Sequence, residues 1–185
     1  GAETSEHLYT CIDLESKSFS DRLWIFADEK LSRNFDNGYD GYKLYISPNI
    51  AQIYAIEQDG NYQINSVDDL NNTTIAFQPG EDWDYQLIFN NHNLEKRYSK
   101  LLLFDIAKEK VIDITANGSV YNFTVDPKLN SNARFKLITE KKQTPDVDPS
   151  KVGFYTENNN LHIYNYGNTG NVMIYDISGR LLFKR

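Results

Sequence analysis

The sequence predicts an all-β protein: an antiparallel β-sandwich, jelly-roll-like, followed by a small C-terminal β-meander, a partial immunoglobulin-like sandwich. Three observations lead to this prediction. The 185 residues include 13 Tyr, 10 Phe and 2 Trp, and aromatic residues favour pleated, half-buried strands. Short apolar segments, some alternating with polar residues, recur between turn signals. Helical periodicity is nearly absent, and the two helix candidates, around residues 28–32 and 94–98, are short.

The β-sandwich module is predicted over residues 1–139. Its strand candidates are short and lie at the spacing expected of a sandwich or jelly roll. In chain order they are residues 21–27, 43–46, 52–57, 62–65, 73–78, 85–90, 101–106, 111–115, 120–125 and 133–139. Such a set is enough for one good-sized domain with its own core.

Turn signals separate these strands. Asp59-Gly60-Asn61 predicts a tight hairpin, because Asp and Gly tolerate positive φ. Residues 107–110 (AKEK) predict a four-residue hairpin loop between two apolar segments.

Residues 140–151 (EKKQTPDVDPSK) are predicted to be a linker, since they are charged and contain two prolines. Beyond them, residues 152–185 hold short strand candidates at 153–157, 161–166, 171–177 and 180–184. A meander of this size buries little apolar area. It must pack on the first domain, pair with another chain or belong to a longer domain. We therefore expect an unpaired strand edge or an intermolecular sheet through residues 152–185.

Charge, cysteine content and hydropathy exclude several classes of protein. The net charge of −7 and the pI of about 4.9 give a surface that repels phosphate backbones, so no nucleic-acid partner is expected. The one cysteine, Cys11, can form neither an internal disulfide nor a Cys-rich metal site. No window of about 18 apolar residues occurs, so no membrane-spanning segment is expected.

Two stretches resemble parts of exported proteins of Gram-negative bacteria that use the type nine secretion system. Residues 170–185 (GNVMIYDISGRLLFKR) make residues 152–185 similar to the front part of the C-terminal sorting domain of such proteins. Residues 22–139 resemble an adhesin-like β-sandwich module of the same proteins, on the segments RLWIFADE (22–29), FDNGYDGYKLY (35–45), QIYAIEQDGNYQINSV (52–67), IAFQPG (75–80), LLLFDIAKEKVIDIT (101–115) and VYNFTV (120–125).

Residues 152–185 depart from the sorting-domain pattern in two ways. FYTENNN (154–160) stands where that domain usually opens with a Tyr-Pro-Asn-Pro type segment, and the usual final strands do not follow Arg185. We therefore expect a truncated, divergent sorting domain. The resemblance implies an exported protein that is periplasmic, on the outer surface or secreted, and that acts in adhesion.

Asp36 and Asp40 lie in D-N-G-Y-D-G, the one segment that suggests a metal. An EF-hand loop needs an oxygen side chain at its third position and Glu at its twelfth, and Gly38 and Ser47 stand there instead. A different calcium site that uses either aspartate is one interpretation. The other is a turn in which the two aspartates cap backbone amides. No other cofactor is expected.

No catalytic residue is predicted. His7, His92 and His162 are far apart in sequence, and no Gly-x-Ser-x-Gly motif occurs. Cys11 has only His7 near it in sequence, whereas a nucleophile needs an activating base beside it. The sequence therefore predicts a protein that is not an enzyme, and an enzyme of unrecognised type is the third hypothesis, after two binding functions.

Trp83, Asp84 and Tyr85 are the ligand-binding candidates, just past the Pro79-Gly80 turn. An aromatic face flanked by carboxylates can stack on a sugar ring and bond its hydroxyls. The alternative is that Trp83 caps the rim of the core. The sequence thus predicts a non-catalytic surface module for adhesion or display that contacts an unidentified protein or glycan. A carbohydrate-binding module that accompanies a glycan-degrading system is the alternative function.

Overall fold

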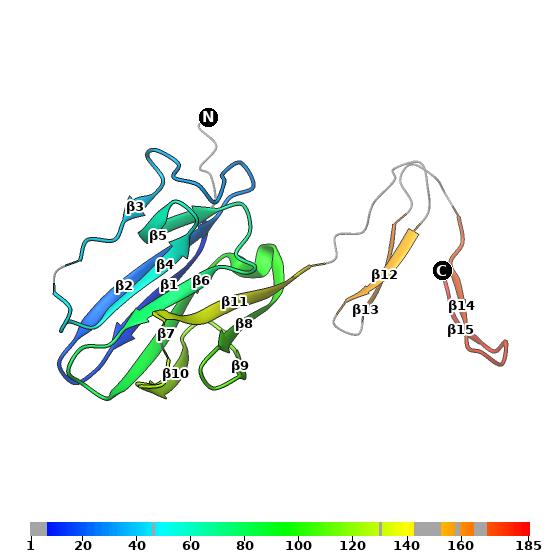
Figure 1. Cartoon of the computed structure of the whole chain (residues 1–185). Helices are drawn as coiled ribbons and strands as arrows, with labels where there is room; N and C mark the ends of the chain where they lie inside the picture. The colour runs from blue at the N-terminus through cyan, green and yellow to red at the C-terminus, as the bar shows by residue number, and fades with distance from the viewer. Residues whose placement is uncertain (1–6, 46, 130, 143–152, 158–159, 165–169) are drawn as a thin grey trace. The chain divides into compact units, whose positions relative to one another are not determined.

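The computed structural model describes residues 7–45, 47–129, 131–142, 153–157, 160–164 and 170–185, and it confirms the all-β fold class. The chain forms two compact units, Gly1–Lys142 and Gln143–Arg185, each described here by itself (Figure 1). Most of the expected linker, residues 143–151, lies outside the described residues.

The first unit is one 11-stranded sheet in the order β10-β7-β1-β2-β5-β4-β6-β11-β8-β9, with β3 paired to β5 beside this path. A single 3-10 turn, η1 (Leu94–Lys96), lies between β7 and β8. The strands are β1 (Leu8–Glu15), β2 (Ser20–Ala27), β3 (Gly41–Tyr42), β4 (Gln52–Glu57), β5 (Gly60–Val67), β6 (Thr74–Gln78), β7 (Asp84–His92), β8 (Tyr98–Asp105), β9 (Lys110–Asp113), β10 (Ser119–Thr124) and β11 (Ala133–Lys141).

Four elements differ from the sequence-based expectation. Strand β1 has no counterpart among the expected strands, although Ile12 and Leu14 alternate with Asp13 and Glu15 as a half-buried strand requires. The strand expected at 43–46 is wrong for residues 43–45, which follow the two-residue β3 as coil; Ile46 is outside the described residues. No helix forms at 28–32, and the 94–98 candidate gives only η1.

The sheet is mixed rather than wholly antiparallel, because β2 and β5 run parallel, with Trp24 opposite Ile64. A parallel pair needs a crossover connection, and here the chain between the two strands passes through β3 and β4. The antiparallel β4–β5 hairpin then places β4 on the far side of β5. The segment between β2 and β4 contacts β5 through β3 and through the Lys43 amide, which donates to the Asn61 carbonyl at 2.8 Å.

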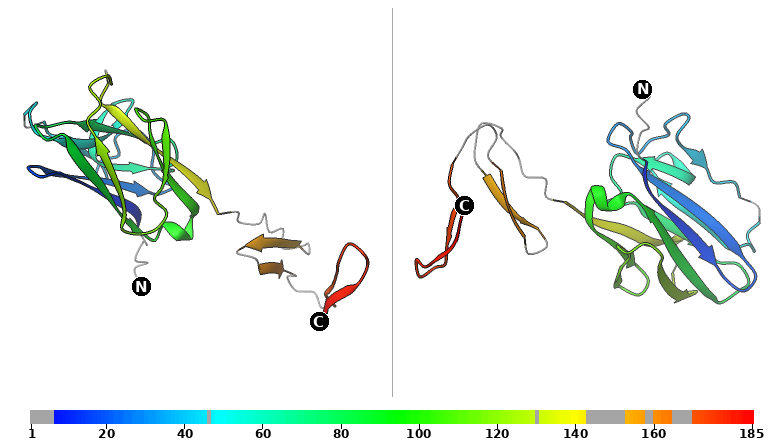
Figure 2. Two further views of the ribbon diagram at one scale, coloured as in Figure 1. Left: turned by 90° about the horizontal axis from the view of Figure 1, so that it is seen from below. Right: turned by 180° about the vertical axis from the view of Figure 1, so that it is seen from behind.

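The sheet curls on itself until its two ends meet through side chains. Figure 2 shows the blue strands β1 and β2 and the yellow strand β11 on opposite sides of this curl, while the green strand β7 continues the sheet from β1. The Tyr121 hydroxyl on β10 donates to the Asp105 carboxylate on β8 at 2.8 Å. The Arg134 guanidinium on β11 donates to both oxygens of the same carboxylate, at 2.7 and 3.0 Å. This near-barrel is consistent with the predicted β-sandwich.

Aromatic rings fill the space between the layers. Phe123 on β10 packs edge-to-face on Phe77 of β6 at 4.9 Å and on Phe135 of β11 at 5.1 Å between ring centroids. Such edge-to-face pairs add stability beyond the area they bury. The aromatic content of the sequence therefore serves the core that joins opposite ends of the sheet.

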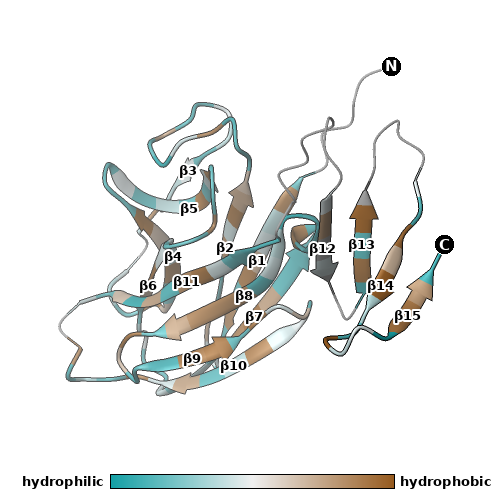
Figure 3. Cartoon of the chain, turned by 90° about the vertical axis from the view of Figure 1, so that its right-hand side faces the viewer, coloured by the Kyte–Doolittle hydropathy of each residue, from teal (hydrophilic) through white to brown (hydrophobic). Residues whose placement is uncertain are grey.

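The second unit contains two separate hairpins. Strand β12 (Gly153–Glu157) pairs with β13 (Asn160–Tyr164), and β14 (Met173–Tyr175) pairs with β15 (Leu181–Lys184). Asp176 closes the second hairpin by accepting hydrogen bonds from the Ser178 and Arg180 backbone amides. Figure 3 shows brown apolar bands on β13, β14 and β15. Large apolar side chains are exposed across the unit, namely Phe154, Leu161, Ile163, Met173, Tyr175, Ile177, Leu181, Leu182 and Phe183.

Candidate functional site

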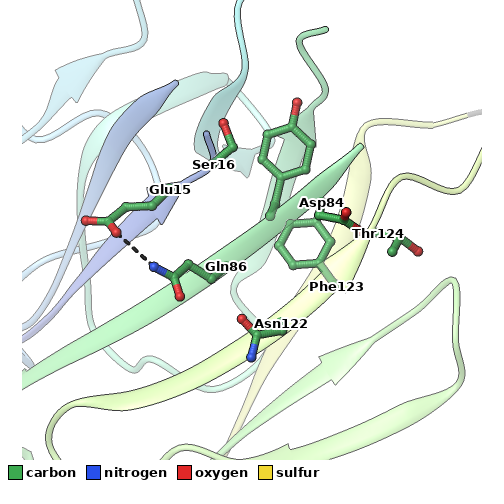
Figure 4. Close-up of a pocket in the computed structure, with 8 residues that line it drawn as sticks. Glu15, Ser16, Asp84, Gln86, Asn122, Phe123 and Thr124 are labelled. Atoms are coloured by element: carbon green, nitrogen blue, oxygen red, sulfur yellow. Dashed lines mark hydrogen bonds between the residues drawn. The ribbon is translucent and has the colours of Figure 1, made fainter. Parts of the chain in front are cut away.

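A shallow recess of about 460 Å³ lies on the outer face of the first unit, at one end of β1, β7 and β10 (Figure 4). Its polar lining consists of cross-strand neighbours: Glu15 lies opposite Gln86, and Gln86 lies opposite Asn122. Because side chains alternate along strands, these three share the outer face. Gln86 donates its amide hydrogen to Glu15 at 2.8 Å, which orients both groups.

The structure separates the members of the expected stacking pair. Trp83 precedes β7, and its side chain is 58% exposed. Tyr85 is 3% exposed, and its ring packs against Phe77 in the core at 4.8 Å between centroids. The Tyr85 hydroxyl accepts a hydrogen bond from the Gly80 amide at 2.9 Å. Trp83 and Tyr85 therefore do not form one exposed aromatic strip, because the second residue of β7 faces inward.

Asp84 and Tyr85 both line the recess, and Asp84 is the exposed one of the two. It is the first residue of β7, is exposed, and lies opposite Thr124 of β10. Asp82, two residues before Asp84, holds the turn between β1 and β2 by accepting hydrogen bonds from the Ser16 hydroxyl at 2.7 Å and the Ser18 amide at 2.7 Å. These bonds hold the pKa of Asp82 below its usual value. A ligand role for Trp83, Asp84 and Tyr85 stays a prediction.

Asp36 and Asp40 lie in the segment between β2 and β4, and both accept hydrogen bonds from backbone amides. Asp36 accepts from the Ser32 amide at 2.8 Å, and Asp40 accepts from the amides of Asp36 at 2.7 Å and Ser66 at 2.6 Å. Burial raises the pKa of Asp40, although these amide bonds oppose the rise. This geometry is that of the turn interpretation. No group of three or more His, Cys, Asp or Glu side chains is placed to hold a metal among the described residues, and calcium binding stays untested.

The potential nucleophile and bases occupy structural positions. Cys11 is buried on β1, and burial raises its pKa to about 11, which disfavours the reactive thiolate. The His92 ring stacks on Tyr9 at 4.9 Å, and the His7 ring meets the edge of Phe26 at 6.2 Å. His162 belongs to β13 in the other unit.

The recess offers amides, hydroxyls and carboxylates to a hydrogen-bonding ligand. Nothing in the sequence marks the lining residues Glu15, Gln86, Asn122 and Thr124 as a site. Alternation along β7 and β10 indicates that Gln86 and Asn122 point outward. Glu15, Gln86 and Asn122 lie side by side because β1, β7 and β10 pair. These strands are far apart in sequence, and no local feature of the sequence predicts that they pair.

Together, these observations define an all-β module with a polar recess on its first unit. The described part of the chain contains no helix long and apolar enough to cross a membrane.

Comparison with known proteins shows one relationship that covers nearly all of the chain. The chain is similar to the minor fimbrium subunit Mfa5 of Porphyromonas gingivalis, with 31% identity over 177 residues, which is 94% of this chain and 14% of that protein. The chain thus spans about a seventh of the length of this relative. No family model and no solved structure matches the chain. Similarity to a fimbrial subunit is consistent with an adhesin-like exported module.

Proposed function

We propose that this chain is a non-catalytic module for adhesion or display in an exported, fimbria-associated protein. The supporting observation is the 31% identity to a minor fimbrium subunit over 94% of the chain. Exposed aromatic side chains on the first unit, among them Tyr42, Tyr45 and Trp83, agree with a role in contact, because Tyr and Trp are enriched at binding surfaces.

Bead adhesion tests this function. Beads that carry purified residues 1–185 are incubated with host cells and with fimbriae isolated from the producing bacterium, and retention is counted under flow. We expect retention well above that of beads carrying the same chain after heat denaturation. Equal retention on both kinds of bead, for both targets, would contradict the adhesion function.

A more specific part of the proposal is that the protein is exported through the type nine secretion system. Its support is the similarity of residues 170–185 to the sorting domain, together with the β14–turn–β15 hairpin that these residues form. A reporter fused to residues 152–185 should reach the cell surface in a host with this system and stay inside a mutant host that lacks it. Equal surface reporter in the two hosts would exclude this route.

A second specific part of the proposal is that two chains pair through residues 152–185. The exposed apolar side chains of the two hairpins, such as Phe154, Ile177 and Phe183, support it, because exposed apolar patches usually mark interaction surfaces. Light scattering should find a concentration-dependent increase in mass for residues 1–185 and a constant monomer mass for residues 1–142. A monomer at every concentration of the full chain would refute the pairing.

Carbohydrate binding is the alternative function, and the position of Trp83 favours it. This exposed indole lies next in sequence to Asp84, which lines the 460 Å³ recess, so an aromatic face and polar groups are near one another. A glycan array probed with the wild-type chain and with Trp83→Ala should then show signals that the substitution removes. An array without signals would leave protein contact as the adhesive function.

A further inference from the structure

A second cavity, of about 240 Å³, lies where the starts of β2 and β4 meet β5 and the segment that follows β3. It lies apart in sequence from Trp83 and from the strands β7 and β10 that line the recess. Its lining combines polar groups from Asp21, Lys43, Gln52 and Gln63 with the apolar surfaces of Tyr42 and Leu44.

The Lys43 ammonium and the Asp21 carboxylate form an ion pair in the lining. Lys43 is buried, and it also donates to the Gln63 side-chain oxygen at 2.7 Å. Asp21 accepts a further hydrogen bond from the Ile53 amide at 2.8 Å. The two opposite charges cancel, so these groups offer both donors and acceptors without net charge.

Gln52 supplies the observation that points to a ligand. Its side chain is 2% exposed and lines the cavity, and its Oε1 accepts no hydrogen bond from the described residues. Buried side-chain oxygens nearly always have a partner, because an unpaired one retains the full cost of losing water. A hydroxyl donor inside the cavity would satisfy this oxygen.

Tyr42 gives the rim of the cavity a fixed aromatic face. Its side chain is 50% exposed, yet its ring stacks on Phe35 at 4.6 Å and packs on Tyr62 at 5.2 Å. A Cβ on Gly60 would lie 2.8 Å from the Tyr42 ring, so the glycine allows the ring to lie close to the backbone. Asp59 accepts from the Phe35 amide at 2.8 Å and from the Tyr62 hydroxyl at 2.7 Å. The ring is thus held in place before any ligand arrives, which reduces the entropy cost of binding.

We propose that this cavity binds a single neutral sugar ring at the end of a surface glycan, an inference that rests on the proposed adhesion function and names its ligand class. The C–H face of the ring lies on Tyr42, and a hydroxyl donates to Gln52 Oε1. Hydroxyls both donate and accept, as the Lys43–Asp21 pair and Gln63 require. The volume is below the roughly 300–1,000 Å³ of sites for drug-sized ligands, in keeping with one ring.

Saturation-transfer NMR on the full chain tests this inference directly. The probes are free glucose, galactose, mannose, fucose, N-acetylglucosamine and N-acetylgalactosamine. At least one should bind, and Gln52→Met and Tyr42→Ala should each weaken its affinity about tenfold or more. Tyr39→Ala is the matched control, because Tyr39 is an exposed tyrosine of the same segment outside the cavity lining. Its affinity should equal that of the wild type.

Thermal unfolding separates loss of a ligand contact from loss of structure. Gln52→Met removes an unpaired buried oxygen at nearly constant volume, so its Tm should equal or exceed the wild-type Tm. Weaker binding together with an unreduced Tm assigns the residue to the ligand. A lowered Tm with unchanged affinity would make Gln52 structural and overturn the inference.

Two further outcomes would also overturn it. One is that none of the six sugars binds the wild-type chain. The other is that Trp83→Ala abolishes binding while Gln52→Met leaves it intact, which would move the site to the recess. Bead adhesion keeps the two proposals apart. Wild-type adhesion without sugar binding would remove the sugar site alone, whereas sugar binding without adhesion would remove the adhesion function alone.

Discussion

Arg134 places a guanidinium in the core, where its side chain is 1% exposed and the Asp105 side chain is fully buried. It also donates to the Thr124 carbonyl at 3.2 Å. The guanidinium carbon also lies 5.3 and 5.4 Å from the ring centroids of Phe123 and Phe135. A buried charge is tolerated only when it is paired and hydrogen-bonded in this way.

Arg134→Met should therefore be among the most destabilising single substitutions in the chain. It leaves the Asp105 carboxylate buried without its cation, so we expect the free energy of unfolding to fall by about 3–5 kcal/mol. Urea denaturation of residues 1–142 measures this loss. The double substitution Arg134→Met with Asp105→Leu should recover most of it, since an apolar pair carries no buried charge. A single-variant loss below about 1 kcal/mol would show that the pair contributes little.

The same carboxylate predicts a dependence of stability on pH. Burial alone would raise the pKa of Asp105, but hydrogen bonds from Arg134 and Tyr121 outweigh burial and lower it. With a folded pKa below the unfolded value of about 3.9, stability is present above that value and is lost as the pH falls through the folded pKa. The urea concentration at the midpoint of denaturation should therefore decrease once the pH falls below about 4. Asp105→Asn should flatten this decline, and an unchanged slope in that variant would assign the decline to other acids.

The sequence does not reveal this residue pair. Arg134 occurs in the strand segment ARFKLIT beside Lys136, which is half-exposed, and nothing local distinguishes the two cations. Their burial is decided by what lies opposite, and Asp105 is 29 residues away. Tyr85 shows the same limit, because its position beside Trp83 and Asp84 suggests a stacking residue while its place in β7 turns it inward.

At the scale of elements, local turn chemistry is what the sequence predicts well. Asp59-Gly60-Asn61 predicts a hairpin, and Glu57 indeed pairs with Gly60 across the β4–β5 turn. Residues 107–110 predict a second hairpin, confirmed by the pairing of Asp105 with Lys110. The parallel β2–β5 pair and the β1–β7 pair escape prediction, because they join distant segments without a turn signal. Both surface cavities are built on such distant pairings.

Gly80, between β6 and β7, lies very close to Phe19 and Ala51. A Cβ at this position would lie 2.6 Å from the Phe19 ring and 2.8 Å from the backbone nitrogen of Ala51. Gly80→Ala should lower the free energy of unfolding by about 1–3 kcal/mol, as overpacking does. Gly41→Ala is the matched control, because its nearest neighbours are Ile64 side-chain atoms at 3.6 Å or more. Equal stability of the two variants in urea would contradict the close approach.

At the scale of the whole molecule, the first unit should fold without the second. Every member of its core cluster, from Ile12 to Leu137, lies within Gly1–Lys142. Deleting residues 143–185 should therefore shift the Tm of the remaining domain by no more than about 2 °C, less than a loss of 1 kcal/mol produces in a domain of this size. Differential scanning calorimetry of the two lengths measures the shift. A much larger drop would show that the second unit stabilises the first.

The strand order has a mechanical consequence for the first unit when it is placed under tension. The described chain enters the first unit through β1, which is hydrogen-bonded to β2 and β7, and leaves it through β11, which is hydrogen-bonded to β6 and β8. Tension applied at the two ends thus reaches interior strands, and each must break two ladders before it can be pulled out. The edge strands β9 and β10, which would peel away one bond at a time, carry none of that load directly.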